Sequence, residues 1–418
     1  MNVIVLGAGL AGVASAWYLS RAGHSVSVIE RGEGPALETS FANGGQVSVS
    51  HPEPWANPRA PRQILRWLGR PDAPLKFRPR ADWKQWSWAA AFLRECLPAR
   101  TRRNTDAIAA LALHSRAQLH ALREETGIEY EREARGILHL FFEAADFAAA
   151  GARARMLRAY GMQARVLDAR ECMAIEPALA GCRAPLQGGL YAPEDESGDA
   201  HLFAERLAAL CAGHGVRFLY RTRAIGWDRA DGRVCGVRIA EADGRSGLLR
   251  ADAFLVCLGS YSAQFVEPLG ERLPIYPVKG YSVTLPLAPG DLAPRVSITD
   301  ESRRIVCSRL GAWLRIAGTA ELCGYDRDID RARCEAILAR ARELFPGVRE
   351  AGEPQFWAGL RPTTPSNVPI IGRSRVPNVF LNTGHGSLGW TLACGSARAI
   401  AEILGGRDPG VAFPFRKA

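Results

Sequence analysis

Two glycine-rich segments, one near each end of the chain, have compositions suited to binding anionic groups. The first, VIVLGAGLAGVAS at residues 3–15, spaces its glycines as G-x-G-x-x-G. The second, TGHGSLGWTLACGSA at residues 383–397, is a glycine-rich loop with one histidine that runs into an apolar, small-residue stretch. Glycine lets backbone N–H groups approach an anion, and a helix N-terminus adds a favourable dipole. Two such loops could hold the two ends of one long ligand.

The first segment has the sequence context that a dinucleotide-binding fold requires. Residues 2–6 predict a short strand, residues 11–22 a helix, and residues 25–29 a second strand that is followed by Glu30. Glu30 could accept hydrogen bonds from ribose hydroxyls, and its charge would disfavour a 2′-phosphate. The alternative is that the glycines serve only a tight turn without a ligand. In the dinucleotide-binding interpretation, Gly7 would permit the tight turn, Gly9 the approach of the backbone to a pyrophosphate, and Gly12 close helix–strand packing.

The surroundings of this fingerprint favour FAD over NAD. A further loop, ETSFANGGQ at residues 38–46, follows Glu30 closely. FAD carries a pyrophosphate in its middle and an isoalloxazine ring at one end, so two glycine-rich turns could hold it. We expect the helix that starts near Leu388 to direct its positive end toward the flavin N1–C2=O region. An NAD-dependent dehydrogenase, the rival hypothesis, would have no use for the loop GHGSLGW at residues 384–390.

We therefore expect FAD to contact the three loops and the chain beside them. The expected contacts are Val3, Leu6, Gly7, Ala8, Gly9, Leu10, Ala11, Gly12, Glu30, Arg31, Thr39, Ser40, Asn43, Gly44, Gly45, Gln46, Ala224, Gly259, Gly384, Gly386, Ser387, Leu388 and Gly389.

The bulk composition is that of an ordinary globular protein large enough for two domains. The chain has 418 residues, of which 47% are hydrophobic and 23% charged. No apolar run is long enough to span a bilayer, and the N-terminus lacks the basic region of a secretory signal, so we expect a cytoplasmic protein. The ten cysteines form no C-x-x-C pair and no Cys/His cluster with ligand spacing. We expect reduced, buried thiols and no metal site.

The β/α segments lie at the start, middle and end of the chain, which predicts a second domain inserted into the first. We expect the FAD-binding domain at residues 1–60, 190–270 and 346–418. The substrate-binding domain would then take residues 61–189 and 271–345. Within these ranges a helix is expected from Asn104, as its N-cap, to a stop at Gly127, and a hairpin at residues 224–240 with its turn at 230–232.

A basic, tryptophan-rich insert occupies residues 59–103. It contains twelve Lys and Arg and three Asp and Glu, and the whole chain has a formal net charge of +10. A membrane surface with acidic lipids is one partner that fits, because indole rings favour the headgroup layer. Nucleic acid is a weaker alternative, and a solvated cationic face without a partner is the third. The tryptophans in and just before the insert are Trp55, Trp67, Trp83, Trp86 and Trp88.

Together these motifs resemble the FAD-carrying small subunit of bacterial D-amino acid dehydrogenases, within the D-amino acid oxidase and glycine oxidase superfamily. The resemblance rests on the N-terminal fingerprint, ALETSFANGGQ, CLGSYS, YPVKGYSVTLP, GLRPTTP and TGHGSLGWTLACGSA, which span nearly the whole chain. It implies a glutathione-reductase-type Rossmann domain of the α/β class, with an inserted antiparallel-sheet substrate domain in a two-domain α+β arrangement.

The resemblance also implies an activity. It implies oxidative deamination of D-amino acids to 2-oxo acids and ammonia, with electrons passed to a quinone and peripheral association with the cytoplasmic face of the inner membrane. A glycine, sarcosine or proline oxidase of the same superfamily is the alternative. No cysteine stands near GLRP, so non-covalent FAD is expected. Where relatives carry Asp-Gly after GLRPTTP, this chain has Ser366 and Asn367. Asn tolerates left-handed backbone, so the turn should survive.

The resemblance and the chemistry together indicate candidate catalytic residues. Hydride transfer from an amino acid needs a cation for the carboxylate, and Arg361 in GLRPTTP matches the arginine that clamps this group in related oxidases. A structural salt bridge is its alternative role. Lys279 could lie near flavin N5 through a water or merely cap a strand. Tyr281 and Tyr261 could offer hydroxyls to the substrate or belong to the core. His385 could line the active site or bond to backbone.

Overall fold

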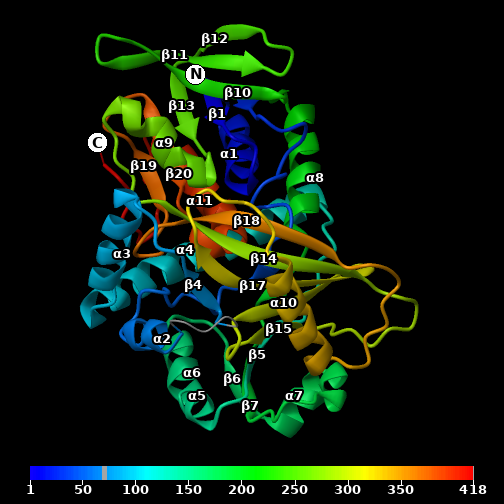
Figure 1. Ribbon diagram of the computed structural model, residues 1–418. Coiled ribbons are helices and arrows are strands. Elements are labelled where there is room, and N and C mark those ends of the chain that lie inside the picture. Colours follow the sequence, from blue (N-terminus) through cyan, green and yellow to red (C-terminus); the bar gives the residue numbers. More distant parts are fainter. Residues whose placement is uncertain (68–72, 418) are drawn as a thin grey trace.

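The protein is described here from a computed structural model that covers residues 1–67 and 73–417. Two large β-sheets form two layers of the molecule, and helices pack against both (Figure 1). The expected basic insert is described except for its residues 68–72, which lie outside the described ranges. No helix within the described ranges is long and apolar enough to cross a membrane.

A six-stranded sheet forms the upper part of the molecule in Figure 1 and contains both predicted N-terminal strands. Its strand order is β19-β20-β13-β1-β2-β9, and all neighbours are parallel except β19 against β20. The carboxyl ends of the parallel strands therefore meet at one edge, where ligands of such sheets bind. The strands are β1 (Asn2–Leu6), β2 (Ser25–Ile29), β9 (Arg217–Leu219), β13 (Ala253–Val256), β19 (Ile370–Arg373) and β20 (Val379–Thr383).

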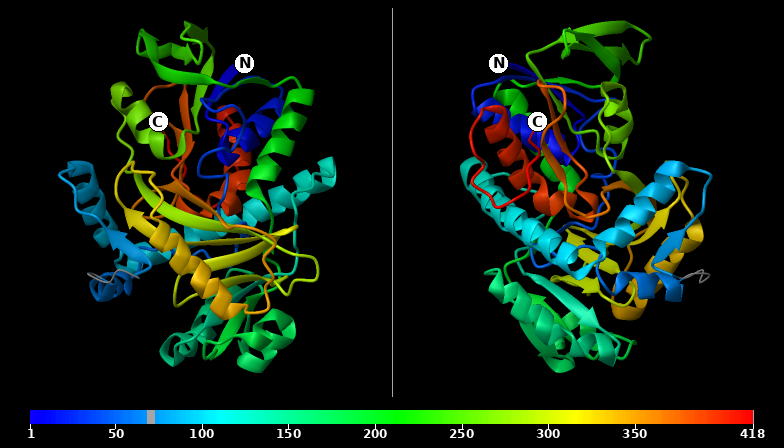
Figure 2. Two further views of the ribbon diagram at one scale, coloured as in Figure 1. Left: turned by 45° about the vertical axis from the view of Figure 1, so that its right-hand side comes forward. Right: turned by 90° about the vertical axis from the view of Figure 1, so that its left-hand side faces the viewer.

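Successive side chains of β1 pack into two different hydrophobic cores, because side chains alternate between the two faces of a strand. Val3 and Val5 pack on the helical side, whereas Ile4 and Leu6 pack with Trp227 of a small antiparallel sheet on the other side. The helices of the first face are α1 (Leu10–Arg21), α8 (Ala200–Gly213), α11 (Gly389–Leu404) and α4 (Pro98–Thr126), and Figure 2 shows α4 running close to α11. The small sheet is β10 (Thr222–Ala230), β11 (Arg233–Glu241) and β12 (Ser246–Arg250).

A nine-stranded sheet forms the second layer. Its order is β18-β14-β17-β16-β15-β5-β7-β6, with β4 pairing β17, and most pairs are antiparallel. Helix α10 (Arg331–Leu344) covers one face, and the other faces the first sheet. The strands are β4 (Leu75–Phe77), β5 (Ile137–Phe141), β6 (Arg165–Asp168), β7 (Gly188–Ala192), β14 (Tyr276–Pro286), β15 (Ser297–Asp300), β16 (Ile305–Leu310), β17 (Trp313–Leu322) and β18 (Gln355–Thr363).

The remaining elements connect the layers. Short helices α5 and α6 precede β6, and α7 with η1 follows it. A two-stranded ladder links the loop at residues 38–46 to the middle of the chain. These elements are β3 (Gln46–Val47), α2 (Ala60–Trp67), α3 (Trp83–Glu95), α5 (Ala144–Ala148), α6 (Ala150–Ala159), α7 (Ala169–Ile175), η1 (Pro177–Gly181), β8 (Glu196–Ser197), η2 (Gly259–Tyr261), α9 (Ser262–Val266), η3 (Glu267–Leu269) and η4 (Gly386–Leu388).

The two-domain α/β architecture expected from the sequence is confirmed, and so is the hairpin turn, where Asp231 and Gly232 have φ of 50° and 73°. The predicted helix start at Asn104 was wrong, because α4 begins at Pro98, where proline needs no N–H partner. Asn104 instead donates to Glu95 Oε2 at 3.0 Å. Strand β18 pairs with β14, so the chain at residues 355–363 lies in the second sheet, beyond the boundary expected at 346.

Candidate active site

One cavity of about 1320 Å³ lies between the two sheets and receives all three loops identified from the sequence. Typical ligand cavities measure roughly 300–1,000 Å³, so this one can hold a large cofactor and a second molecule. Its walls come from the carboxyl edge of the first sheet, the open face of the second sheet, and helix α2. The cavity is therefore the candidate active site.

The N-terminal loop has the geometry that a pyrophosphate-binding turn needs. Gly7 has a φ of 97°, and a Cβ there would lie 2.7 Å from the carbonyl oxygen of Cys257. A Cβ on Gly12 would lie 1.9 Å from the carbonyl oxygen of Gly7, so helix α1 can pack here only with glycine. Gly9 provides no side-chain cap for α1, and among the described residues the one side chain that bonds the helix start is Ser40 of the middle loop, whose Oγ accepts from the Leu10 N–H at 3.4 Å. The first N–H groups of α1 are thus positioned toward the cavity that Gly7 and Gly9 line.

Glu30 closes this turn at the carboxyl end of β2. Its Oε2 accepts a hydrogen bond from the Ala8 N–H at 2.8 Å, and its Oε1 accepts one from the Gly32 N–H at 2.8 Å. Each carboxylate oxygen keeps a further lone pair, and Glu30 lines the cavity. This position suits the ribose contact expected from the sequence.

The C-terminal loop presents a second helix N-terminus to the same cavity. Helix α11 starts at Gly389 without a side-chain cap at Leu388 and without an acidic residue in its first turn. Gly384 and Gly386 have φ of 79° and 56°, which only glycine adopts readily. The dipole of α11 therefore favours negative charge in the cavity, as expected for the ring end of a flavin.

The middle loop is fixed against the second sheet. Thr39 Oγ1 donates to the Leu360 carbonyl at 2.7 Å, and Gln46 Nε2 donates to Ser297 Oγ at 2.9 Å. A Cβ on Gly44 would stand 2.4 Å from Val306 Cγ2, so glycine is required for this close approach. These contacts place the backbone of residues 43–46 at the cavity wall between the two sheets.

Most of the residues expected to contact the cofactor line the cavity. Five do not: Val3 and Leu6 are buried in β1, Ala8 bonds Glu30 through its backbone, and Gly12 and Gly384 shape the turns from behind. Those that line it are Gly7, Gly9, Leu10, Ala11, Glu30, Arg31, Thr39, Ser40, Asn43, Gly44, Gly45, Gln46, Ala224, Gly259, Gly386, Ser387, Leu388 and Gly389.

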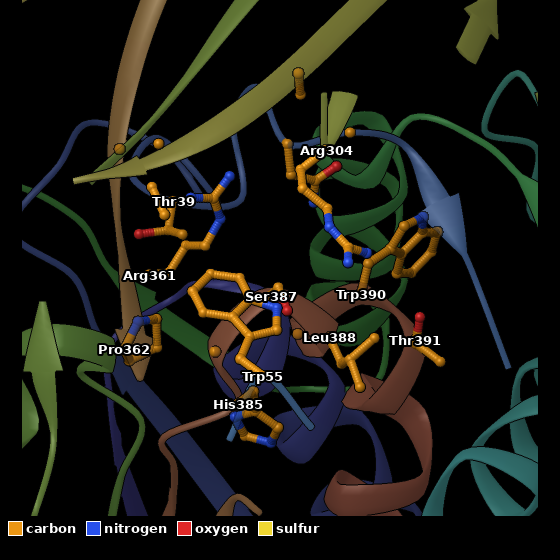
Figure 3. A pocket seen from close by; sticks show the side chains of 18 of the residues that line it. Thr39, Trp55, Arg304, Arg361, Pro362, His385, Ser387, Leu388, Trp390 and Thr391 are labelled. Atoms are coloured by element: carbon orange, nitrogen blue, oxygen red, sulfur yellow. The ribbon is translucent and has the colours of Figure 1, made fainter. Parts of the chain in front are cut away.

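Arg361 extends into the cavity from β18, as Figure 3 shows. Its Nη1 donates to the Thr319 carbonyl at 2.8 Å. A Cβ on Gly280 would lie 2.2 Å from Nη1, so this glycine leaves room for the guanidinium. Burial lowers the pKa of Arg361 to about 10, which still leaves it charged at neutral pH. No carboxylate pairs with it among the described residues, so the guanidinium can bind an anionic ligand group.

Lys279 does not line the cavity, contrary to its expected place near the flavin. Its Nζ donates to Asp326 Oδ2 at 3.1 Å and to the Asp328 carbonyl at 3.0 Å. Tyr281 reaches the cavity wall, but its hydroxyl donates to Glu321 Oε2 at 2.7 Å. Both side chains alternate with Gly280 along β14, so they project to the α10 side of the sheet and away from Arg361.

Tyr261 and His385 both line the cavity. The Arg31 guanidinium lies over the Tyr261 ring at 4.2 Å from its centroid, which places the ring in the cofactor region. His385 Nε2 is 3.0 Å from Ser396 Oγ, and burial lowers the pKa of His385 to about 4. His385 is therefore neutral at pH 7 and holds the loop onto α11.

Sequence reasoning missed Thr319, which holds Arg361 in place. Thr319 has a φ of 60°, an unusual conformation for a β-branched residue, and its buried Oγ1 makes no hydrogen bond within the described ranges. Trp55 was noted only as the tryptophan just before the basic insert, yet it lines the cavity (Figure 3). Its backbone N–H donates to Asn367 Oδ1 at 2.8 Å. Asn367 has a φ of 60°, so the expected left-handed turn is confirmed.

A buried network of polar side chains behind the cavity was also missed. Ser50 Oγ lies 2.5 Å from Asp195 Oδ2 and 3.3 Å from His139 Nε2, and His139 Nδ1 lies 2.9 Å from Glu301 Oε1. Burial raises the pKa of Asp195 to about 7. Glu301 lines the cavity, and Arg153 donates to its Oε1 at 2.6 Å. The four residues are far apart in sequence, so no spacing signal marks them.

Two of these groups, together with His51, could ligate a metal, since ligand atoms of His51, His139 and Glu301 lie within 4.8 Å of one another. Arg153 already bridges two of them, because its Nη2 lies 2.7 Å from His51 Nδ1 and its Nη1 bonds Glu301. A metal ion would have to displace this guanidinium. Arg304, with a φ of 54°, also bonds Glu301 and points toward the cavity in Figure 3.

Comparisons with known proteins agree with this site. Residues 2–403 match the family described as FAD dependent oxidoreductase. A D-amino acid dehydrogenase of Dechloromonas aromatica is 52% identical over 415 residues, covering 99% of each chain. A D-amino acid dehydrogenase of Paramagnetospirillum magneticum is 48% identical, covering 99% of this chain and 97% of the relative.

Solved structures show the same fold at low sequence identity. Glycine oxidase from Geobacillus kaustophilus superposes with a TM-score of 0.75 at 22% identity, over 99% of this chain and 96% of that one. L-proline dehydrogenase from P. horikoshii gives a TM-score of 0.72 at 16% identity, over 98% and 96%. The family match covers residues 2–403, and the glycine turns and the two helix N-termini at the cavity fit an FAD site. The chain therefore belongs to the FAD-dependent oxidoreductase family.

Proposed function

We propose that this protein oxidises D-amino acids of the D-alanine type to 2-oxo acids and ammonia. The observation that carries the proposal is the charged Arg361, without a carboxylate partner among the described residues, in the cavity that also receives two helix N-termini. The names of the relatives at 52% and 48% identity support the D-amino acid substrate.

Non-covalent FAD fits the residues that are present. The turn at Gly7 and Gly9 would hold the pyrophosphate, Glu30 the ribose, and the N-terminal end of α11 the ring. When bound, the flavin supplies the acceptor for the substrate α-hydrogen, taken as hydride at N5. The segment around Arg361 contains no cysteine, which supports non-covalent binding.

The chain itself binds and orients the substrate. Arg361 would hold the α-carboxylate through two N–H groups, while Thr319 and Gly280 fix the guanidinium. Hydride leaves only from the neutral amine, so one proton must also leave the ammonium group. The imino acid that forms is then hydrolysed to the 2-oxo acid and ammonia.

For the electron acceptor we propose a quinone, reached at the cytoplasmic face of a membrane. Helices α2 and α3 and the start of α4 carry exposed apolar side chains among basic ones; Trp83 is 81% exposed and Leu65 70%. Indole and cationic groups together suit an acidic lipid surface. The described part of the patch comprises Arg62, Leu65, Arg66, Lys76, Arg78, Arg80, Trp83, Lys84, Trp86, Leu93, Arg94 and Leu97.

Anaerobic mixing with D-alanine and then with L-alanine tests the reaction, with visible flavin absorbance as the readout. Bleaching by the D-isomer alone is expected. Bleaching by neither isomer would contradict the substrate and favour the alternative, a glycine, sarcosine or proline oxidase of the same fold. Cosedimentation with vesicles of acidic lipid tests the surface. Replacement of Trp83 and Trp86 by Ser should abolish the cosedimentation without changing the rate of flavin bleaching by D-alanine.

A further inference from the structure

Beside Arg361 the cavity has an apolar arm whose walls come from outside the cofactor loops, although one wall residue, Trp55, also lies beside Ser387 and Leu388 of the C-terminal loop (Figure 3). Its walls are Trp55, Ile64, Trp67, Leu75 and Phe92, which come from the loop before α2, from α2 itself, from β4 and from α3. None of these side chains carries a charge. Arg59 and Arg66, just before α2 and on it, also line the cavity, but both are exposed to solvent; the other polar lining residues of this segment are Asn57 and Gln63.

The register of the second sheet places this arm directly next to the guanidinium. Arg361 on β18 pairs with Val278 on β14, and directly paired residues project from the same face. Val278 packs in one apolar cluster with Ala320, Leu75, Trp55 and Phe92. The arm therefore begins one strand away from the group that would hold the substrate carboxylate.

A second contact connects the same two features through β17. The Thr319 carbonyl accepts the hydrogen bond from Arg361, and the next residue, Ala320, pairs with Leu75 of β4. The strand segment that holds the guanidinium therefore lies directly beside Leu75, one strand spacing or roughly 5 Å away. Ala320 is small, and the guanidinium itself fills the space over Gly280, so the way from the anchor to the arm lies on the Ala320 side.

The inner wall of the arm is held in place by packing and hydrogen bonds. Phe92 stacks on Trp88 with ring centroids 5.4 Å apart, and Trp88 Nε1 donates to the Thr363 carbonyl at 2.8 Å. Gln85 is fully buried, and its Nε2 donates to the Leu322 carbonyl at 3.2 Å. Helix α3 is thereby fixed to both neighbouring strands, so the arm exists before a ligand enters.

We propose that this arm binds the substrate side chain and selects D-amino acids with large apolar side chains, aromatic or branched. The proposal rests on the proposed function, because it takes Arg361 as the carboxylate anchor, and it narrows the preferred substrates proposed there from the D-alanine type to D-amino acids with larger apolar side chains. D-alanine leaves the arm empty, whereas a phenylalanine or leucine side chain buries apolar surface in it. Such burial is worth a factor of about ten or more in binding.

Anaerobic flavin reduction tests the arm without involving any electron acceptor. In the unmodified protein the second-order rate constant should be at least tenfold higher for D-phenylalanine and D-leucine than for D-alanine. If D-alanine is oxidised but equals or exceeds both, or if D-glutamate exceeds them, the arm is not the side-chain site. If no D-amino acid reduces the flavin, the proposed function itself fails.

Two neighbouring residues of α2 provide a matched pair of variants. Ile64 lines the arm, whereas Leu65 is 70% exposed on the outer face. Ile64→Trp should fill the arm and lower the ratio of the D-phenylalanine rate constant to the D-alanine rate constant at least tenfold. Leu65→Trp should leave this ratio unchanged. Flavin reduction by D-alanine also shows that Ile64→Trp folds.

A smaller replacement provides an independent test if Ile64→Trp fails to fold. Ile64→Ala widens the arm and should raise the preference for D-tryptophan over D-leucine. The proposal is overturned if Ile64→Trp slows D-alanine and D-phenylalanine equally, or if Leu65→Trp acts like it. It is also overturned if Ile64→Trp leaves both amino acids unchanged and slows only reoxidation by a short-chain quinone, since the arm would then belong to the acceptor.

Discussion

The Arg361 guanidinium lies across Gly280, and a single added methyl group at that glycine would stand 2.2 Å from Nη1. The two residues face each other from β18 and β14, where Arg361 pairs with the residue two positions before Gly280. A glycine on one strand thus makes the space in which the cation of the next strand is held. This pairing gives the first prediction.

Gly280→Ala should displace the guanidinium and raise the KM for D-alanine by about tenfold or more, because a carboxylate bond to arginine is geometry-sensitive. Steady-state kinetics with a soluble dye acceptor measure this. Gly213→Ala is the matched control, since a Cβ there meets nothing within 4 Å. An unchanged KM in Gly280→Ala would mean that Arg361 does not hold the substrate carboxylate.

Gly12→Ala should abolish FAD binding, because the new Cβ would lie 1.9 Å from the Gly7 carbonyl oxygen and push α1 away from the turn. The purified variant should be colourless, and it should not regain visible flavin absorbance when FAD is added. The same Gly213→Ala control should remain yellow. A yellow Gly12→Ala protein would show that the turn tolerates displacement and does not depend on close helix–strand packing.

Lys279→Met should lower stability without affecting chemistry. Lys279 is 1% exposed and supplies two hydrogen bonds, to Asp326 Oδ2 and to the Asp328 carbonyl, so its loss leaves both acceptors without that partner. The expected cost is about 1–3 kcal/mol in the free energy of unfolding, measured with urea. The anaerobic rate of flavin reduction by D-alanine should stay within twofold. A hundredfold slower flavin reduction would instead mean that Lys279 takes part in catalysis.

The contrast between Arg361 and Lys279 shows what the sequence could and could not predict. Local patterns placed the glycine turns, the first strands and the hairpin, because each depends on neighbours within a few residues. The α/β architecture and the family were likewise predicted. The face to which Lys279 points depends on the pairing of β14 with strands from distant parts of the chain, and no local pattern contains it.

Long-range pairing also explains the other differences. Strand β18 joins the second sheet although its sequence lies among segments of the first, so the boundary expected at residue 346 separates paired strands. Thr319 became part of the site only because β17 is irregular beside β14, which turns its carbonyl toward Arg361. The network of Ser50 and Asp195 joins residues 145 positions apart.

The buried carboxyl of Asp195 predicts a pH dependence of stability. Burial raises its pKa to about 7, against a partial lowering by the hydroxyl and N–H of Ser50, the N–H of Val49 and the charge of Arg116. Because this pKa is higher in the folded protein than in the unfolded chain, the contribution of Asp195 to stability is complete below about pH 4. It is lost as the pH rises through about 7.

Asp195→Asn stays neutral at every pH, so it should remove this dependence. Between pH 4.5 and pH 8 the free energy of unfolding should fall more steeply in the unmodified protein than in Asp195→Asn, by on the order of 4 kcal/mol at most. Urea unfolding of the FAD-bound protein at several pH values measures the difference. Asp243→Asn, at an exposed surface carboxyl that pairs with Arg245, should keep the normal slope. Equal slopes in Asp195→Asn and the unmodified protein would mean that Asp195 is ionised in the folded state, and that a hydrogen bond from Ser50 compensates its burial.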